Sequence, residues 1–554
     1  MVKLISTPNK LNQMKRRDII KNLAIIPFAG GFFPHESVAG TSSYEMNQTS
    51  GPLSIGPKIY ESIGVDPVIN CRGTFTIIGG SLERPEVLAA SKAAAEHFVQ
   101  YDELAFGVGR RLAEITKAEW GVISSGCAAG LKHVTAACVT GGNPEKLIRI
   151  PDLTGMEKNE VIIPRYSRNA YDHAIRNIGV KIVTVETADE LARAINDHTA
   201  MIYIMAGDQS EKGRPLSLEV IAGLAKPRNI PVLVDAAAEI LTIPNVHLEQ
   251  GATVVAYSGG KAICGPQCAG LLLGKKDLLM AAWQASSPHH GPGRDNKVGK
   301  EEMLGMLAAV EAWITRDHPA EWKTWLSWLD NISKKVSKID GIETSVNEPT
   351  DLSNRSPVLS ITWDPDKLHI TAEEVAEEFA RTKPRVAIGA RSRDGKTSLS
   401  VTTGQMQPGN DKIVADRIHA ILSKKRKPRS EEMTAPSVAI GGHWDVTVDF
   451  FSSSSQHSLY IEQDGNWIQG THRSDFSVQE VMGMVEGNQV KLHSQVRIPG
   501  SRVTYLFSGT ASDGKIDGSI YLGEYLTAKF TAQRAVYRGE RRKVVIPGGP
   551  PLAT

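Results

Sequence analysis

Cysteine is scarce in this chain of 554 residues, and the five present are Cys71, Cys127, Cys138, Cys264 and Cys268. An odd number cannot pair completely, and no C-x-x-C pair or Cys/His array is found. A disulfide framework and a zinc site are therefore excluded as expectations, and no metal is predicted. Cys264 and Cys268 stand four residues apart in a Gly/Pro-containing loop, where ordinary packing is expected.

The chain also lacks an excess of charge and long apolar runs. Its 63 basic and 61 acidic residues give a formal net charge of +2, which argues against nucleic acid or an anionic membrane surface as a partner. The one basic run, KKRKPR at residues 424–429, is short and is interpreted as a solvated linker. No segment after the N-terminal region approaches eighteen consecutive apolar residues, so no membrane span is predicted there.

The N-terminal region has the order of features found in export signals. A basic segment at residues 15–21 (KRRDIIK) precedes an apolar stretch at residues 23–33, and Ser37-Val38-Ala39 follows as a small-x-small site. This pattern predicts a signal peptide over residues 1–39, and its paired arginines resemble a twin-arginine signal. A basic helix of a cytosolic protein is the alternative. We expect an exported, periplasmic protein.

The length predicts two or three domains. After a linker at residues 40–58, short apolar runs alternate with helix-patterned stretches over residues 59–325, which predicts an α/β domain with a mainly parallel sheet. Residues 326–423 predict a smaller α+β domain, followed by a linker at residues 424–440. Alternating segments separated by turn signals then predict an antiparallel β-barrel or sandwich over residues 441–536, with a tail at residues 537–554.

Aromatic and histidine side chains of the predicted β domain leave its role open. The aromatic residues can line a ligand cavity or form a packed core, and the packed core is favoured. They are Trp444, Tyr460, Trp467, Phe476, Tyr505, Phe507 and Tyr521. The histidines lack ligand spacing.

Two segments of the α/β region carry residues suited to an anion and a heteroaromatic ring. Ser125, Gly126 and Cys127 lie in a small-residue turn that opens a helix, where free backbone N–H groups favour an anion. Asp235 follows the buried run Val232-Leu233-Val234, at the strand end where open α/β sheets place ligands. A carboxylate there can keep a pyridine nitrogen protonated, although a helix N-cap is the plainer role for a single aspartate.

Lys261 is the third element. It follows an apolar strand and lies in Ser258-Gly259-Gly260-Lys261, where a solubility lysine is not expected. Burial lowers the pKa of an ammonium group and frees the amine to form a Schiff base. Ser258 can hydrogen-bond a phosphate beside it.

Together these motifs resemble the selenocysteine synthase-like branch of the fold-type I pyridoxal-phosphate enzymes, over residues 69 to about 404. This branch includes the seryl-tRNA selenium transferases and the D-glucosaminate-6-phosphate ammonia-lyases. The matching motifs are Ile69-Asn70-Cys71-Arg72-Gly73-Thr74, Gly79-Gly80-Ser81, Ser124-Ser125-Gly126, Val234-Asp235-Ala236-Ala237, Ser258-Gly259-Gly260-Lys261, Gly265-Pro266-Gln267, Arg294, Lys297-Val298-Gly299-Lys300-Glu301 and Pro384-Arg385-Val386.

The resemblance implies pyridoxal 5'-phosphate as the cofactor and assigns roles to particular residues. It implies that Lys261 forms the Schiff base, that Asp235 partners the ring nitrogen, and that Ser125, Gly126, Cys127 and Ser258 surround the phosphate. Residues 165–173 are implied to cover the ring, with Arg168 and His173 as competing candidates. Arg385 is a candidate for the substrate carboxylate, with a structural ion pair as its alternative. Arg294 and Lys300 are candidates from a neighbouring subunit, because homodimers or larger homo-oligomers are implied.

The expected substrate is a small molecule with an amino group, either an amino acid or an amino-sugar acid, that replaces Lys261 on the cofactor. Ammonia-lyase chemistry by α,β-elimination is the first expectation, and racemase, epimerase or aminotransferase chemistry is the alternative. A catalytically inactive binding protein is a further alternative, against which the intact Lys261 and Asp235 argue. The export signal and the β domain depart from the cytosolic members, so a tRNA or an intracellular sugar phosphate is not expected as the substrate.

Overall fold

The computed structural model describes residues 52–428, 432–536 and 543, and the chain divides into two compact units. One unit comprises residues 42–428, and the other contains the C-terminal β domain. The predicted signal peptide lies outside the described residues, as does most of the predicted tail. In the part of the chain that the structure describes, no helix has the length and apolar character needed to cross a membrane.

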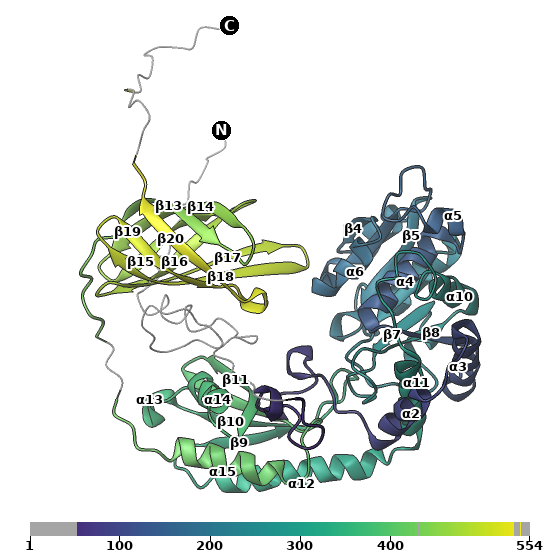
Figure 1. Ribbon diagram of the computed structural model, residues 1–554, viewed down its shortest axis with the longest axis horizontal. Helices are drawn as coiled ribbons and strands as arrows, with labels where there is room; N and C mark the ends of the chain where they lie inside the picture. Colours follow the sequence, from purple (N-terminus) through teal and green to yellow (C-terminus); the bar gives the residue numbers. More distant parts are fainter. Residues whose placement is uncertain (1–51, 429–431, 537–542, 544–554) are drawn as a thin grey trace, which may run out of the picture. The chain divides into compact units, whose positions relative to one another are not determined.

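A seven-stranded sheet forms the centre of the larger unit (Figure 1). All its neighbouring strands pair in parallel except β8, which runs antiparallel to both of its neighbours. In sheet order the strands are β2 (Trp120–Ser124), β8 (Gly270–Gly274), β7 (Val254–Ser258), β6 (Val232–Asp235), β5 (Thr199–Met205), β3 (Glu160–Pro164) and β4 (Lys181–Val185). The central strands are buried on both faces, as expected of apolar runs in a parallel sheet, and the fold prediction is confirmed.

Helices cover this sheet, and α4 is the most buried of them along its length. The helices are α2 (Pro85–Ala95), α3 (Tyr101–Thr116), α4 (Cys127–Thr140), α5 (Pro144–Leu147), α6 (His173–Arg176), α7 (Ala188–Ala194), α8 (Leu218–Ala225), α9 (Val246–Glu249), α10 (Lys276–Gln284) and α11 (Lys300–Thr315). Small side chains allow α4 to pack closely on the sheet. A Cβ on Gly130 would lie 2.8 Å from Leu272 Cδ2 of β8.

The smaller α+β region contains a five-stranded sheet and the helices α12 (His318–Val336), α13 (Pro365–Leu368), α14 (Ala372–Arg381) and α15 (Asn410–Leu422). Its strand order is β1 (Val68–Cys71), β11 (Arg385–Arg393), β12 (Lys396–Thr402), β10 (Val358–Trp363) and β9 (Glu343–Asn347). β1 pairs in parallel with β11, although the sequence prediction placed residues 59–325 in the large domain. The four residues of β1 gave no signal of a partner strand more than 300 residues away.

The C-terminal unit is a closed barrel of eight antiparallel strands in sequential order (Figure 1). The strands are β13 (Gly442–Asp449), β14 (Ser454–Asp464), β15 (Trp467–Arg473), β16 (Val478–Glu486), β17 (Gln489–Ile498), β18 (Ser501–Ser512), β19 (Lys515–Tyr521) and β20 (Thr527–Arg534). Closure decides between the barrel and the sandwich left open by the sequence. Trp444, Tyr505 and Phe507 are buried in the barrel core, whereas Phe476 is fully exposed.

A polar cluster interrupts this apolar barrel core. His457 Nδ1 lies 3.0 Å from His472 Nε2, and His472 Nδ1 lies 2.7 Å from the hydroxyl of Ser494. The side-chain amide of Gln479 approaches the same Nδ1 atom at 2.9 Å. Both histidines are buried, so the cluster is a hydrogen-bonded polar group inside the barrel, and His457 Nε2 lies 3.5 Å from Asp475 Oδ2.

Candidate active site

Lys261 lies in a tight loop at the end of β7. The Gly259 N–H donates to the Ala269 carbonyl at 2.8 Å, and the Gly265 N–H donates to the Gly259 carbonyl at 2.9 Å. A Cβ on Gly260 would lie 2.8 Å from Gln267 Cα. The loop therefore needs glycine where it folds against the Gly-Pro-Gln segment, and this close packing fixes where Lys261 leaves the strand.

The amine of Lys261 is partly buried and points to the N-terminal segment of the unit. Its Nζ donates to the Thr74 carbonyl at 3.2 Å. Burial lowers the pKa of Lys261 below its ordinary value of 10.5, and the nearby groups of Cys127 and Asp235 oppose this shift. The amine is thus more easily deprotonated than that of a surface lysine, as Schiff-base formation requires.

Asp235 is buried at the end of β6 and is held by three donors. The Tyr203 hydroxyl donates to Oδ2 at 2.9 Å, the Ala237 N–H donates to Oδ1 at 3.1 Å, and the Cys127 thiol lies 3.6 Å from Oδ1. Burial raises the pKa of Asp235, and the donors, Tyr203 first, act in the opposite direction. This site can hold a carboxylate that faces a protonated nitrogen.

Tyr203 and Asn169 are site residues that the sequence analysis missed. Asn169 Nδ2 donates to the Tyr203 hydroxyl at 3.2 Å, which extends the chain of hydrogen bonds from Asp235 to the segment after β3. Tyr203 lies in the fully buried part of β5. A tyrosine within a buried apolar strand is a usable signal, because its hydroxyl needs a partner there.

The turn before α4 provides a place for an anion. Gly126 has φ +82° and caps the fourteen-residue helix without a side-chain bond, so the first backbone N–H groups of α4 remain available. Gly270 of β8 pairs with Ser124 on one side and with Ser258 on the other, which brings the turn and the end of β7 together. Within the described chain, the Ser125 and Ser258 hydroxyls have no hydrogen-bond partner.

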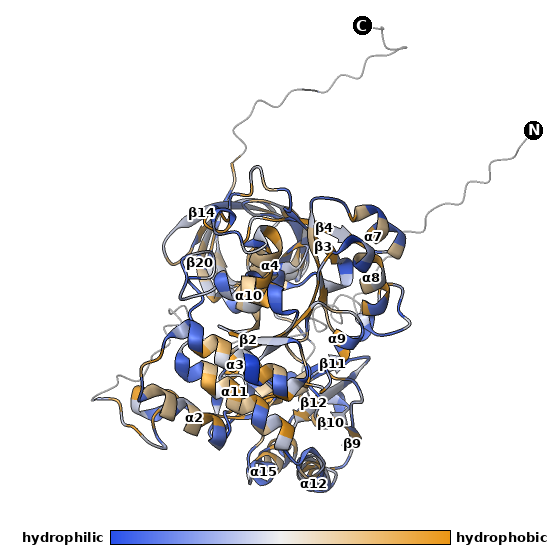
Figure 2. Cartoon of the chain, turned by 90° about the vertical axis from the view of Figure 1, so that its right-hand side faces the viewer, coloured by the Kyte–Doolittle hydropathy of each residue, from blue (hydrophilic) through white to orange (hydrophobic). Residues whose placement is uncertain are grey.

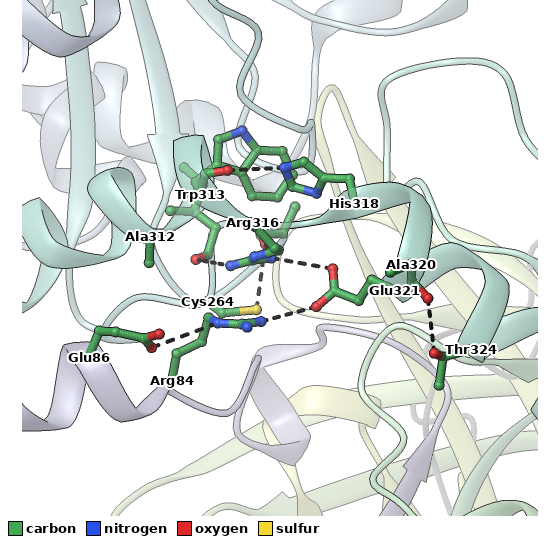
Figure 3. A network of polar contacts seen from close by, with 12 residues as sticks. Arg84, Glu86, Cys264, Ala312, Trp313, Arg316, His318, Ala320, Glu321 and Thr324 are labelled. Atoms are coloured by element: carbon green, nitrogen blue, oxygen red, sulfur yellow. Dashed lines mark hydrogen bonds and ion pairs between the residues drawn. The ribbon is translucent and has the colours of Figure 1, made fainter.

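Two arginines and a glutamate form a polar network that contacts the loop carrying Lys261 (Figure 3). Arg316 donates to the carbonyls of Ala262 and Ile263 at 3.3 and 3.2 Å, directly after Lys261. Glu321 of α12 accepts from Arg84 at 3.0 Å, and its other oxygen lies 3.9 Å from Arg316. Figure 3 shows Glu321 between the two guanidinium groups. The N-terminal segment, the loop and α12 are thereby joined.

The remaining predicted site residues do not all meet Lys261. Arg168 donates to buried Asp172 at 2.6 Å and to Thr184 Oγ1 at 3.2 Å. His173 is exposed at the start of α6. These contacts do not test a role of Arg168 or His173 over the cofactor ring. The Arg168 side chain is already hydrogen-bonded, and His173 is exposed to solvent. Asn169, between them, is the residue of this segment that joins the Asp235 network.

Arg385 is half-buried and Arg294 is exposed, and the side chain of each makes one hydrogen bond among the described residues. Arg294 approaches the Ser287 hydroxyl at 3.5 Å, and Arg385 donates through Nε to the Ala380 carbonyl at 2.7 Å. Lys300, at the start of α11, pairs with Glu301 next to it. Their predicted roles toward substrate stay predictions.

The residues present fit pyridoxal phosphate. They supply an amine with a lowered pKa, a buried carboxylate and a helix N-terminus flanked by two free serine hydroxyls. Ser81 provides a further donor. Its N–H donates to the Gly260 carbonyl at 3.0 Å, while its buried hydroxyl has no partner among the described residues. Each of these groups suits one part of the cofactor: aldehyde, ring nitrogen or phosphate.

Comparison with known proteins identifies the family. A family model described as aminotransferase class-V matches residues 153–294, which include Asp235 and Lys261. D-glucosaminate-6-phosphate ammonia lyase from Salmonella typhimurium is 32% identical over 302 residues, which cover 53% of this chain and 79% of that protein. The chain belongs to this ammonia lyase's family. It is a pyridoxal-phosphate enzyme of the selenocysteine synthase-like branch, so the predicted family and cofactor are confirmed.

Two further similarities cover more of the chain. The 5'-C-glycyluridine monooxygenase-decarboxylase from a Streptomyces species is 27% identical over 378 residues, or 66% of this chain and 92% of that protein. A solved structure of D-glucosaminate-6-phosphate ammonia-lyase is similar with a TM-score of 0.59 and 28% identity, covering 67% of this chain and 99% of that one. The relatives of this chain thus carry the names of different reactions.

Proposed function

We propose that this chain is an ammonia-lyase that acts on an amino acid or amino-sugar acid by α,β-elimination. The observation that carries the proposal is the site itself, in which Lys261 follows β7 and buried Asp235 ends the adjacent strand β6, with the N-terminal residue of α4, Cys127, beside Asp235. The similarity to D-glucosaminate-6-phosphate ammonia lyase supports elimination of ammonia as the reaction and an amino-sugar acid as the class of substrate.

Each residue has a role that follows from its position. When bound, pyridoxal phosphate supplies an electron sink for negative charge at the substrate Cα. Asp235 would hold a proton on the ring nitrogen, and the α4 N-terminus with Ser125 and Ser258 would bind the phosphate. Lys261 would be the base that removes the Cα proton of the substrate, because burial lowers the pKa of its amine.

Racemase, epimerase and aminotransferase reactions use the same first proton transfer and remain alternatives. A decarboxylation that consumes oxygen is a further candidate, favoured by the similarity to the glycyluridine enzyme over 66% of this chain. D-glucosaminate and a glycyl group each carry an amino group and an acid carbon, so the α-amino acid unit is common to both candidates. Products distinguish them: ammonia with a keto acid, an inverted amino acid, or carbon dioxide.

A visible absorption spectrum tests the proposal first. We expect wild-type protein to bind pyridoxal phosphate with a visible Schiff-base band that Lys261→Ala abolishes and that Lys212→Ala, an exposed matched control, retains. D- and L-amino acids and amino-sugar acids are then added, and the shift of the band and the released ammonia are measured. A protein that stays colourless with added pyridoxal phosphate would favour the inactive binding protein instead.

We also propose that the enzyme is a homodimer or a larger homo-oligomer. Exposed apolar side chains are concentrated between residues 53 and 99, and Figure 2 shows hydrophobic residues on α2 within this region. They are Leu53, Ile55, Tyr60, Ile63, Val65, Val68, Phe75, Ile77, Leu82, Leu88, Phe98 and Val99. Exposed apolar side chains in this number favour association between copies. Sedimentation velocity measures it directly, and a monomer at micromolar concentration contradicts it.

Export is a separate proposal that rests on the sequence of residues 1–39. We propose a twin-arginine signal and a periplasmic location. A twin-arginine route carries folded proteins, which suits an enzyme that binds its cofactor before export. The double substitution Arg16→Lys and Arg17→Lys is expected to retain the protein in the cytoplasm of a bacterial host, as measured by fractionation. Equal export of the variant would contradict the proposal.

A further inference from the structure

We propose that Arg72 binds the carboxylate of the amino substrate, an inference that rests on the proposed function and identifies the substrate as an acid. Arg72 follows β1 directly and is absent from the sequence-predicted site residues. Its position, its charge and its lack of a partner each support the proposal.

The turn after β1 fixes the backbone of Arg72 in the segment that contacts Lys261. Asn70 Oδ1 accepts from the N–H groups of Arg72 and Gly73, both at 3.0 Å, and Asn70 Nδ2 donates to the Gly73 carbonyl at 3.0 Å. Gly73 has φ +112°, which favours glycine. The next residue, Thr74, accepts the hydrogen bond from Lys261 Nζ. Arg72 is therefore two residues from the carbonyl that contacts the catalytic lysine.

Arg72 is a half-buried cation without an acidic partner. Its guanidinium carbon lies 4.6 Å from the centre of the Phe75 ring, and no hydrogen bond or ion pair of its side chain is found among the described residues. Burial lowers the pKa of the Arg72 guanidinium below its ordinary value, and no acidic group offsets the shift. By contrast, Arg168 is paired with Asp172 and Arg316 with Glu321. A carboxylate from the substrate would supply the missing charge and accept from both arms of the guanidinium fork.

The strand register distinguishes Arg72 from Arg385, the arginine that the family motif indicates. In the β1–β11 pair, Arg385 is level with Val68, and Cys71 is level with Ile388. At about 3.3 Å per residue, Arg385 starts roughly 10 Å from the end of the pair at which Arg72 leaves the sheet. Its Nε is also used by the Ala380 carbonyl. Arg72 is thus on the Lys261 side of this pair and Arg385 is at the other end.

The ligand group is assigned as a carboxylate because the acid carbon is bonded to Cα. Lys261 must reach the Cα proton, so the group attached to Cα lies within a few ångströms of the lysine. A phosphate at the far end of an amino-sugar acid is several bonds away. A carboxylate also matches the planar fork of an arginine in a bidentate contact.

Binding to the pyridoxal-phosphate-loaded protein tests the assignment. The probes are D-glucosaminate, its carboxamide and D-glucosaminate 6-phosphate, and dissociation constants are measured by calorimetry and from the shift of the visible band. We expect Arg72→Ala to weaken both carboxylate probes by about 10- to 100-fold, as for loss of a charged hydrogen bond, and to change carboxamide binding by less than about twofold. Arg393→Ala serves as the matched control, because Arg393 is exposed and paired with Asp394.

Every other outcome contradicts either the role of Arg72 or the proposed function. Equal weakening of all three probes, or of none, overturns the role of Arg72, and weakening of the 6-phosphate probe alone assigns Arg72 to a phosphate. Arg72→Gln provides a second variant, and the visible band of each variant reports an intact cofactor site. A wild-type protein without a visible band, or without binding to any probe, contradicts the proposed function and the carboxylate role with it.

Discussion

Asp235 is central to the chemistry of this site. Burial disfavours its negative charge, and neighbouring hydrogen-bond donors stabilise that charge. Burial raises its pKa, and Tyr203, the Ala237 N–H and Cys127 act in the opposite direction. The Cys127 thiol does this as a neutral donor, since burial and Asp235 raise the pKa of that thiol well above its ordinary value. The predicted place of Cys127 at the phosphate concerns the backbone of the turn and stays a prediction, while its thiol lies 3.6 Å from Asp235 Oδ1.

Removal of the Tyr203 hydroxyl is expected to weaken cofactor binding. In Tyr203→Phe the pKa of Asp235 rises further, so less carboxylate is available to hold a protonated ring nitrogen. We expect the dissociation constant for pyridoxal phosphate to rise about tenfold, within the range for one lost hydrogen bond to a charged group, and Asn169→Ala to have a smaller effect. Equilibrium dialysis measures the constant.

The control for this experiment removes a tyrosine hydroxyl elsewhere. Tyr166 donates to the Leu216 carbonyl at 2.8 Å, and Tyr166→Phe is expected to leave the dissociation constant unchanged. If Tyr203→Phe and Tyr166→Phe behave alike, the hydrogen bond to Asp235 has no special role in holding the cofactor.

Among individual residues, the sequence analysis identified those that belong to local sequence motifs. Lys261 and Asp235 each follow a buried strand, and the turn at Gly126 opens a helix, so their neighbours in sequence carry the signal. Tyr203, Asn169 and Arg72 owe their positions to contacts across strands or between distant segments. Their roles follow only from knowing which strands are adjacent, which a single sequence does not specify.

Among the elements, β8 decides the shape of the anion site. A Cβ on Gly270 would lie 2.4 Å from the Gly126 carbonyl carbon and 2.6 Å from the Cys127 nitrogen. Both are backbone atoms that cannot turn aside as a flexible side chain does. The absence of a side chain on β8 thus allows the turn before α4 to reach its observed position.

Gly270→Ala is therefore expected to displace the phosphate-binding turn and to raise the dissociation constant for pyridoxal phosphate by at least about tenfold, a loss on the scale of core overpacking. Fluorescence titration of purified protein measures it. Gly223→Ala is the control, because a Cβ at this position of α8 meets nothing within 4 Å. Unchanged affinity in Gly270→Ala would show that the turn does not depend on this contact.

The barrel allows a prediction about pH. Burial, and then His457, lowers the pKa of His472 to about 3, so His472 is neutral in the folded barrel. The unfolded chain takes up a proton below about pH 6.5 and the folded chain does not, so stability falls as the pH drops from about 6.5 toward about 3. At pH 5 this group alone costs about 2 kcal/mol of the free energy of unfolding.

His472→Gln is expected to remove most of this acid sensitivity. Hydrogen–deuterium exchange of barrel peptides at pH 7.5 and pH 5, corrected for the intrinsic rate, measures the opening free energy in the full chain. His443→Gln changes an exposed histidine of β13 and is expected to behave as wild type. An equal loss of protection in wild type and His472→Gln at pH 5 would assign the acid sensitivity to other groups.

For the molecule as a whole, periodicity predicted the order of the α/β region, the α+β region and the β domain, because each has its own spacing of apolar residues. It could not decide that the β domain closes into a barrel, since closure depends on the pairing of β13 with β20. It also could not place β1, whose partner strand follows after the whole seven-stranded sheet.

That placement of β1 has a consequence for how the enzyme is made. During synthesis, residues 68–71 emerge early, but β11, with which they pair, begins only at Arg385. The seven-stranded sheet is complete in sequence by Gly274, long before this pairing is possible. A nascent chain that stops short of Ile388 already contains the lysine, the aspartate and the anion turn. It lacks the strand that holds Arg72 and Thr74 in place.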